Sequence, residues 1–180
     1  MRVLYVIACA AGVASELGRL VDLAQQRDWD VYVIATPTAV GFLDIEGLEA
    51  QTGRGVRSEH RRSGAGSARS LPQADAIVVA PATYNTINKW AVGISDNYAL
   101  DVLAEAVGLR IPTVVLPFVN AALATHPAFT RSVDVLRDAR VAVVLGPDEF
   151  EPHPPGTGAD HLDAFPWHRA LERAEALLRT

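Results

Sequence analysis

Apolar and polar positions form blocks along the chain, in which short β-branched segments are separated by longer stretches of helical periodicity. The short segments have the length and composition of strands buried on both faces of a sheet. Five such strands are predicted, at residues 3–7, 30–35, 76–80, 113–116 and 141–145. Because helical patterns separate them, we predict a single α/β domain over residues 1–180, with a three-layer, doubly wound parallel sheet.

The segments between the strands show the spacing of apolar residues that is typical of amphipathic helices. We predict helices after residue 15, from about residue 87 through residue 107, around Val133 and Leu136, and at about residues 167–178. The segment of residues 46–72 contains few large apolar side chains, and no helix or strand is predicted in it. Within it, residues 58–70 are expected to be a flexible, basic active-site loop.

Polar side chains follow the central predicted strand. Pro81 has no N–H to donate to a neighbouring strand and is expected to end this one. The hydroxyl and amide groups of residues 83–86 then precede a helix whose first N–H groups lack partners. Ligands of open α/β sheets bind at this end of the strands, and anions are favoured at helix N-termini.

This stretch also carries a resemblance to a known family. Ala80-Pro-Ala-Thr-Tyr-Asn-Thr86, followed by Lys89, Gly93 and Ile94-Ser-Asp-Asn97, resembles the signature of the FMN-dependent cysteine decarboxylase flavoproteins. That family includes phosphopantothenoylcysteine decarboxylase and the lantibiotic peptidyl-cysteine decarboxylases. A weaker similarity extends from residue 3 to about residue 146.

The resemblance implies that FMN is the cofactor. A flavin requires an anion site for its phosphate, hydrogen bonds to its ring edge, and an apolar wall. In the family, FMN is lined by the residues that align with Thr83, Tyr84, Asn85 and Thr86. Phosphate candidates are the small residues Ala11, Gly12 and Val13 and the hydroxyls of Thr36 and Thr38, although a plain turn and a helix cap are alternatives. Candidates for the apolar wall are Ile7, Val79, Phe118 and Val119.

Asn120 is the candidate substrate-binding residue. The segment Pro117-Phe-Val-Asn120 aligns with the family's Pro-x-Met-Asn motif, whose asparagine holds the substrate carboxylate. Asn120 could instead cap the next helix.

Two groups of the family are missing from this sequence. Ser67 occupies the position that aligns with the decarboxylases' histidine, and the predicted flap, residues 146–161, contains no cysteine. His60 and His153 are therefore the candidate proton-transferring residues, together with Asn120 as a further catalytic candidate. Exposure on the surface is the alternative for His60, and a solvated loop is the alternative for His153.

Composition limits the partners. The net charge of −5 offers no basic surface for nucleic acid, and no apolar run is long enough for a membrane span. The single cysteine, Cys9, favours the cytoplasm, and His126, His161 and His168 have no spacing that predicts a metal site. We expect a homo-oligomer, a trimer or dodecamer, because relatives place the flavin between protomers; Trp90 and Tyr98 fit a helix covered on more than one side.

The sequence thus indicates an FMN-dependent lyase resembling the cysteine decarboxylases. Its substrate would be a small thiol or carboxylate, or a peptide C-terminus, handled with altered acid/base groups. Another flavin chemistry, redox or prenyl transfer, is one alternative, and a non-catalytic FMN-binding subunit of a complex is the other.

Overall fold

Five parallel strands form one sheet in the order β2-β1-β3-β4-β5 in this computed structural model, which describes residues 1–60 and 71–179. The chain builds outward from β1 to β2 and then, on the other side of β1, from β3 to β5. The predicted α/β fold with a doubly wound sheet is therefore confirmed. The strands are β1 (Arg2–Ala8), β2 (Trp29–Ala35), β3 (Ala76–Ala82), β4 (Thr113–Pro117) and β5 (Ala142–Val143).

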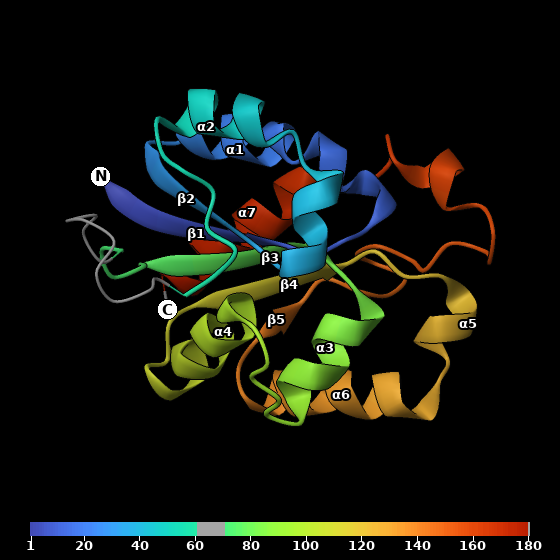
Figure 1. Ribbon diagram of the computed structural model, residues 1–180. Helices are drawn as coiled ribbons and strands as arrows, with labels where there is room; N and C mark the ends of the chain where they lie inside the picture. The colour runs from blue at the N-terminus through green and yellow to red at the C-terminus, as the bar shows by residue number, and fades with distance from the viewer. Residues whose placement is uncertain (61–70, 180) are drawn as a thin grey trace.

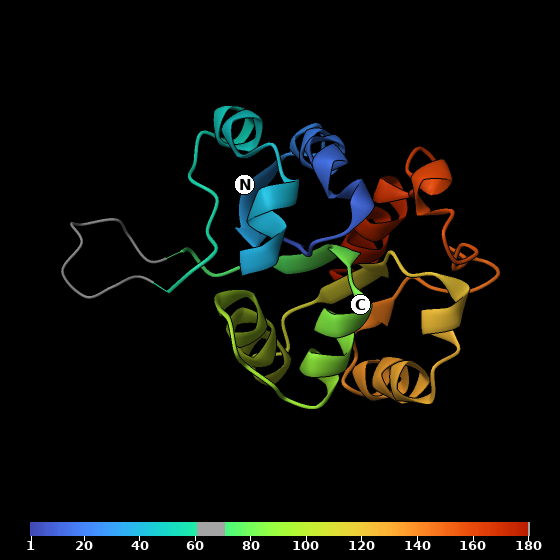
Figure 2. The ribbon, with the colours of Figure 1, turned by 45° about the vertical axis from the view of Figure 1, so that its right-hand side comes forward.

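Helices cover both faces of the sheet, as Figures 1 and 2 show. Successive strand residues point to opposite faces, so Leu4 and Val6 pack under one helical layer while Tyr5 and Ile7 pack under the other. The first layer contains α1 (Gly18–Gln25), α2 (Ile45–Thr52) and α7 (Trp167–Leu177), and the second contains α3 (Tyr84–Ala91), α4 (Tyr98–Gly108) and α6 (Pro127–Asp138). Four short helices lie in the connections: η1 (Gly12–Glu16), η2 (Pro37–Phe42), α5 (Ala121–Ala124) and η3 (Gly158–His161).

The predicted helix from residue 87 to residue 107 is wrong, because α3 and α4 are separate helices. Helix α3 ends at Ala91, and Gly93 follows in the left-handed region with φ 74°. The side chain of Asn97 then accepts a hydrogen bond from the N–H of Leu100 and begins α4. The glycine and the asparagine cap are the local signals that mark this break.

The prediction that Pro81 ends the central strand is also wrong. Strand β3 continues through Pro81 to Ala82, with a cis Ala80–Pro81 peptide bond. The proline lacks an N–H, but its carbonyl oxygen accepts a hydrogen bond from the N–H of Cys9 (3.0 Å). The carbonyl of Ala82 likewise accepts from Phe118 (2.8 Å). At the sheet edge, β5 contains two residues where five were predicted.

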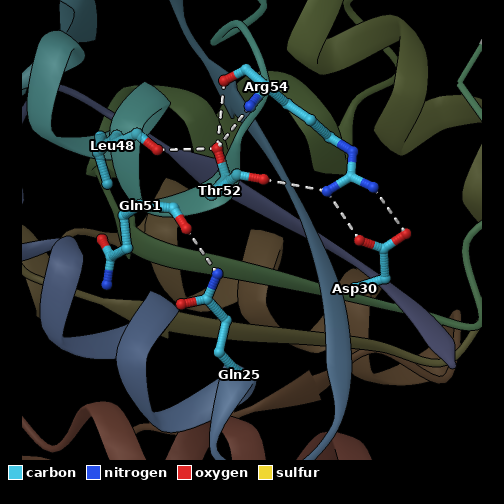
Figure 3. Close-up of polar contacts among 6 residues, drawn as sticks. All are labelled: Gln25, Asp30, Leu48, Gln51, Thr52 and Arg54. Carbon is cyan, nitrogen blue, oxygen red and sulfur yellow. Dashed lines mark hydrogen bonds and ion pairs between the residues drawn. The ribbon is translucent and has the colours of Figure 1, made fainter.

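Helix α2 (Ile45–Thr52) lies where no helix was predicted, at the start of the segment of residues 46–72. Polar contacts fix its C-terminal end (Figure 3). The guanidinium of Arg54 pairs with both carboxylate oxygens of Asp30 on β2 (2.9 and 3.1 Å) and donates to the carbonyl of Thr52 (3.1 Å). On the other side, the amide of Gln25 in α1 donates to the carbonyl of Gln51 (2.9 Å). A helix held largely by polar groups has a weak hydrophobic pattern, which explains the missed prediction.

Candidate functional site

A cleft of about 680 Å³ lies at the carboxyl ends of β1, β2, β3 and β4. This is the edge of a doubly wound sheet at which connections diverge and ligands bind. Within the described residues, its lining comes from six segments: Ala10–Gly12, Thr36–Thr38, Thr83–Thr86 with Lys89, Asp96 and Asn97 with Leu100, Phe118–Asn120 with Leu123, and His153.

The connections after β1 and β2 supply small and hydroxyl side chains. Ala11 and Gly12 line the cleft at the start of η1, whereas Val13 lies below it and is fully buried in the core. Thr36 and Thr38 also line the cleft. The side chain of Thr36 makes no capping hydrogen bond to η2, so its hydroxyl is available to a ligand.

The turn after β3 brings four adjacent predicted residues into the cleft: Thr83, Tyr84, Asn85 and Thr86. The hydroxyl of Thr83 accepts a hydrogen bond from the N–H of Thr86 (3.3 Å) and donates to its hydroxyl (3.2 Å). The Tyr84 ring stacks on Phe129 of α6, with centroids 5.7 Å apart. The turn is therefore a fixed set of hydroxyl, phenol and amide groups at the N-terminus of α3.

The break between α3 and α4 adds residues that were not among the predicted site residues. Lys89 and Asp96 form an ion pair, and both side chains line the cleft with Asn97 and Leu100. The hydrogen bond from Lys89 is the main cause that holds the pKa of Asp96 below its ordinary value. A single continuous helix was predicted for this region. The turn that places Leu100 at the cleft was therefore not predicted.

Asn120 begins α5 at the end of β4. Its side-chain oxygen accepts a hydrogen bond from the N–H of Leu123 (2.9 Å). This oxygen therefore caps α5, which was the alternative role predicted for Asn120. Its amide nitrogen makes no hydrogen bond within the described part of the chain and remains a donor for a ligand. The two roles use different atoms of one side chain.

His153 lies in the wall of the cleft and is 8% exposed, which corrects the expectation of a solvated loop. Its ring lies 4.8 Å from that of Phe118 and 5.5 Å from that of His161, centroid to centroid. Burial, with a smaller contribution from His161, lowers the pKa of His153 below its ordinary value. Its Nδ1 atom is buried without a hydrogen-bond partner among the described residues.

The other histidine predicted to transfer protons, His60, lies elsewhere. His60 does not line the cleft: its ring contacts Asp101 and the edge of Tyr98 in α4, and its side chain is 64% exposed. Ser67 and most of the predicted loop 58–70 lie outside the described residues. Among residues 1–60 and 71–179, no three His, Cys, Asp or Glu side chains gather closely enough to hold a metal ion.

The apolar wall differs from the one expected. Ile7 and Val79 are fully buried between the sheet and its helices and do not reach the cleft. Phe118 and Val119 do line it, and Leu100 joins them. The cleft therefore combines helix N-termini and hydroxyls with an apolar wall, which are the three features that a flavin phosphate, ring edge and ring face require.

Comparison with known proteins identifies the family. Residues 1–159 match the family model described as Flavoprotein. The chain belongs to the Flavoprotein family. The crystal structure of the FMN-dependent cysteine decarboxylase SpaF is similar, with a TM-score of 0.70 and 25% identity over 97% of both chains. The resemblance to this group of flavoproteins, predicted from residues 80–97, is thus confirmed.

Two curated relatives of this Flavoprotein member match by sequence. The coenzyme A biosynthesis bifunctional protein CoaBC of Mycolicibacterium smegmatis is 29% identical over 152 residues, which is 79% of this chain and 34% of that protein. A cysteine/cysteine sulfinic acid decarboxylase from an unknown prokaryotic organism is 37% identical over 65 residues, 36% of this chain and 17% of that protein. The chain thus matches about a third or less of the length of these relatives.

No described helix combines the length and apolar character that a membrane span requires.

Proposed function

We propose that this flavoprotein binds FMN in the cleft and acts as a flavin-dependent lyase of the cysteine decarboxylase type. Its substrate would be a small thiol acid or a peptide that ends in cysteine. The observation that carries the proposal is the arrangement of one cleft, in which the Thr83–Thr86 turn and the amide of Asn120 face the same space. The likeness to SpaF, an FMN-dependent cysteine decarboxylase, supports it.

The residues of the cleft divide into three groups in this proposal. The connections at Gly12 and Thr36 would hold the phosphate, because helix N-termini and hydroxyls donate hydrogen bonds to anions. The Thr83–Thr86 turn would bind the ring edge, and Leu100 and Val119 would exclude water from the ring face. FMN, when bound, supplies a two-electron acceptor for oxidation of the carbon that bears the thiol.

The substrate would lie at the Asn120 end of the cleft. The free amide nitrogen of Asn120 is a hydrogen-bond donor suited to a carboxylate. Oxidation of the neighbouring carbon to a thioaldehyde would then favour loss of that carboxylate as carbon dioxide. Phe118 and Val119 would shape the floor of the pocket and so restrict the size of the substrate.

The test begins with the absorption spectrum of the protein as purified and mass analysis of its released cofactor. We expect a flavin spectrum and FMN. The flavoprotein is then mixed without oxygen with Ala-Ala-Ala-Cys or with the matched peptide Ala-Ala-Ala-Ser. Bleaching of the flavin by the cysteine peptide alone supports a lyase of the proposed type. Reduction only by NAD(P)H would instead indicate a redox enzyme, and no reduction by either would indicate a non-catalytic subunit.

We also propose that the protein is a homo-oligomer, a trimer or a multiple of it, in the cytoplasm. Trp90 does not support this, because it is 6% exposed and packs in the core of its own subunit. Support comes from Val92, Ile94 and Val135, which are 70, 45 and 47% exposed and line an apolar groove between α3 and α6. Burial of the single cysteine, Cys9, is compatible with a reducing compartment.

A further inference from the structure

Very few groups in the cleft can change charge near neutral pH. Of the described residues that line it, Tyr84, Lys89, Asp96 and His153 have titratable side chains. The hydrogen bond from Lys89 holds the pKa of Asp96 below its ordinary acidic value. The imidazole of His153 is the one side chain of this set that exchanges protons near neutrality.

The fold places this imidazole beside Asn120. The backbones of Asn120 and His153 pair as in a parallel sheet, and the carbonyl of His153 accepts a hydrogen bond from the N–H of Ala121 (2.8 Å). The ring packs against Phe118, which precedes Asn120 on the same connection. A ligand whose carboxylate lies at Asn120 therefore has the imidazole as its neighbour.

Neither nitrogen of the ring is committed to a protein partner within the described residues. Nδ1 is buried and unpaired, and a buried polar atom without a partner destabilises the fold. Nε2 faces Gly158, where an added Cβ atom would lie only 3.2 Å away. A histidine that only held the flap in place would be expected to form a hydrogen bond through one ring nitrogen. Neither ring nitrogen of His153 forms one with the described residues.

The surroundings keep the ring neutral. Its titratable neighbour is His161 of η3, whereas Phe118 and Asn120 on the β4–α5 connection and Gly158 on the flap carry no charge. Burial and then His161 lower the pKa of His153, so the imidazole is uncharged at pH 7. A neutral imidazole can accept a proton, and a thiolate formed beside it offsets the cost of burying the positive charge.

We propose that His153 is the proton acceptor for the thiol of the bound substrate. Nε2, the ring nitrogen that is not sealed from the cleft, takes the proton as the S–H bond breaks, which leaves an imidazolium ion and a thiolate, and no other bond changes. The thiolate sulfur then promotes oxidation of its own carbon. This assignment rests on the proposed function and names the group that replaces the histidine expected at Ser67.

The test uses a thiol that binds but cannot be oxidised. Ala-Ala-Ala-penicillamine has a thiol on a carbon without hydrogen, so it cannot form a thioaldehyde. A thiolate beside oxidised flavin gives a long-wavelength charge-transfer absorption, whose rise with pH reports thiol ionisation. We expect the midpoint in the wild-type flavoprotein to lie below that in His153→Asn by about one pH unit or more. His168→Asn, an exposed position on α7, should leave it unchanged.

A second variant guards against a folding defect. Gly158→Ala keeps the imidazole but crowds Nε2, and Gly158 does not have a positive φ, so alanine is tolerated by the backbone. It should raise the midpoint by less than His153→Asn does. Gly108→Ala, where an added Cβ meets nothing within 4 Å, is its control. The rate of flavin reduction by Ala-Ala-Ala-Cys should fall roughly a hundredfold to ten-thousandfold in His153→Asn.

The outcomes separate the two proposals. An unchanged midpoint and reduction rate in His153→Asn, with flavin and peptide bound, would overturn the role of His153 alone. A wild-type protein that binds no flavin, or binds flavin but neither peptide, would overturn the proposed function and this assignment together. NMR of the His153 ring, assigned by its loss in His153→Asn, should show protonation when the penicillamine peptide binds; a ring that stays neutral counts against the proposal.

Discussion

The ammonium group of Lys89 and the carboxylate of Asp96 form an ion pair across the turn that separates α3 from α4. The turn reverses at Gly93, whose φ of 74° allows the two side chains to meet. Both side chains line the cleft, so the conformation of the turn determines this part of the cleft wall.

Asp96→Asn should lower thermal stability at neutral pH, and the loss should disappear in acid. The hydrogen bond from Lys89 lowers the pKa of Asp96 in the folded protein, so its stabilisation is present above the unfolded pKa of about 4 and is lost as the pH falls through the folded value. Unfolding temperatures at pH 7, 5, 4 and 3 measure this. High salt should reduce the difference at pH 7. A difference that persists undiminished at pH 3 would contradict the prediction.

Thr86→Val should weaken flavin binding by about the value of one hydrogen bond, ~1 kcal/mol or roughly fivefold in Kd. The hydroxyl of Thr86 belongs to the hydrogen-bonded turn in the cleft and is 5% exposed. Thr52→Val is the matched control, because that hydroxyl is also buried but donates to the carbonyl of Leu48 in α2 (2.8 Å; Figure 3). Thr52 does not line the cleft. Both should destabilise the fold slightly; equal flavin affinities in the two variants would refute the assignment.

Asn120→Asp should separate the two roles of Asn120. Aspartate retains the oxygen that caps α5, so stability should change little, whereas the amide donor is replaced by a negative charge that repels a carboxylate. We expect flavin content to be retained and turnover of Ala-Ala-Ala-Cys to fall by at least about a hundredfold. Asp44→Ala, which removes the cap of α2, should lower stability by about 1 kcal/mol without this effect. Normal turnover in Asn120→Asp would exclude the carboxylate role.

A charge in the apolar groove between α3 and α6 should dissociate the oligomer. Ile94→Glu places a carboxylate beside the exposed side chains of Val92 and Val135. Light scattering should report a trimer, or a multiple of it, for the wild-type protein and a lower mass for the variant. Leu109→Glu is the control, since Leu109 is 64% exposed at the end of α4. A wild-type monomer with bound flavin would refute the prediction.

Phosphopantothenoylcysteine should be a poor substrate. Ser67 occupies the position of the family's histidine, and residues 146–161 contain no cysteine. The missing cysteine, for which the flap offers no proposed replacement, should cost roughly a hundredfold to ten-thousandfold in turnover. Mass spectrometry of the decarboxylated thiol measures turnover, with a histidine-containing relative as reference. Comparable rates would contradict the prediction, and we expect Ser67→His to leave turnover low, because the flap differs as well.

The sequence was sufficient for the fold and for much of the composition of the cleft. Continuous apolar runs and period-3.6 patterns reflect burial directly, so strands such as β1 and β2 were placed within one or two residues. Polar residues that lie just beyond a strand, such as Thr83 and Asn120, could be predicted to share one site, because parallel strands end at the same edge of the sheet. Helix α2 was missed because its ends are fixed by polar contacts such as Arg54 with Asp30.

By itself, the sequence determined which residues follow each strand, since local patterns and the family motif are linear properties of the chain. Only the tertiary structure decided which of them share a surface. Packing buried Val13 and Ile7 beneath the cleft, and the break at Gly93 brought Leu100 and Asp96 into it. His153 lies more than thirty residues beyond Asn120, and its burial depends on backbone pairing and on contacts with Phe118 and His161. Burial of that ring, and with it a lowered pKa, arises from long-range packing that no local pattern specifies.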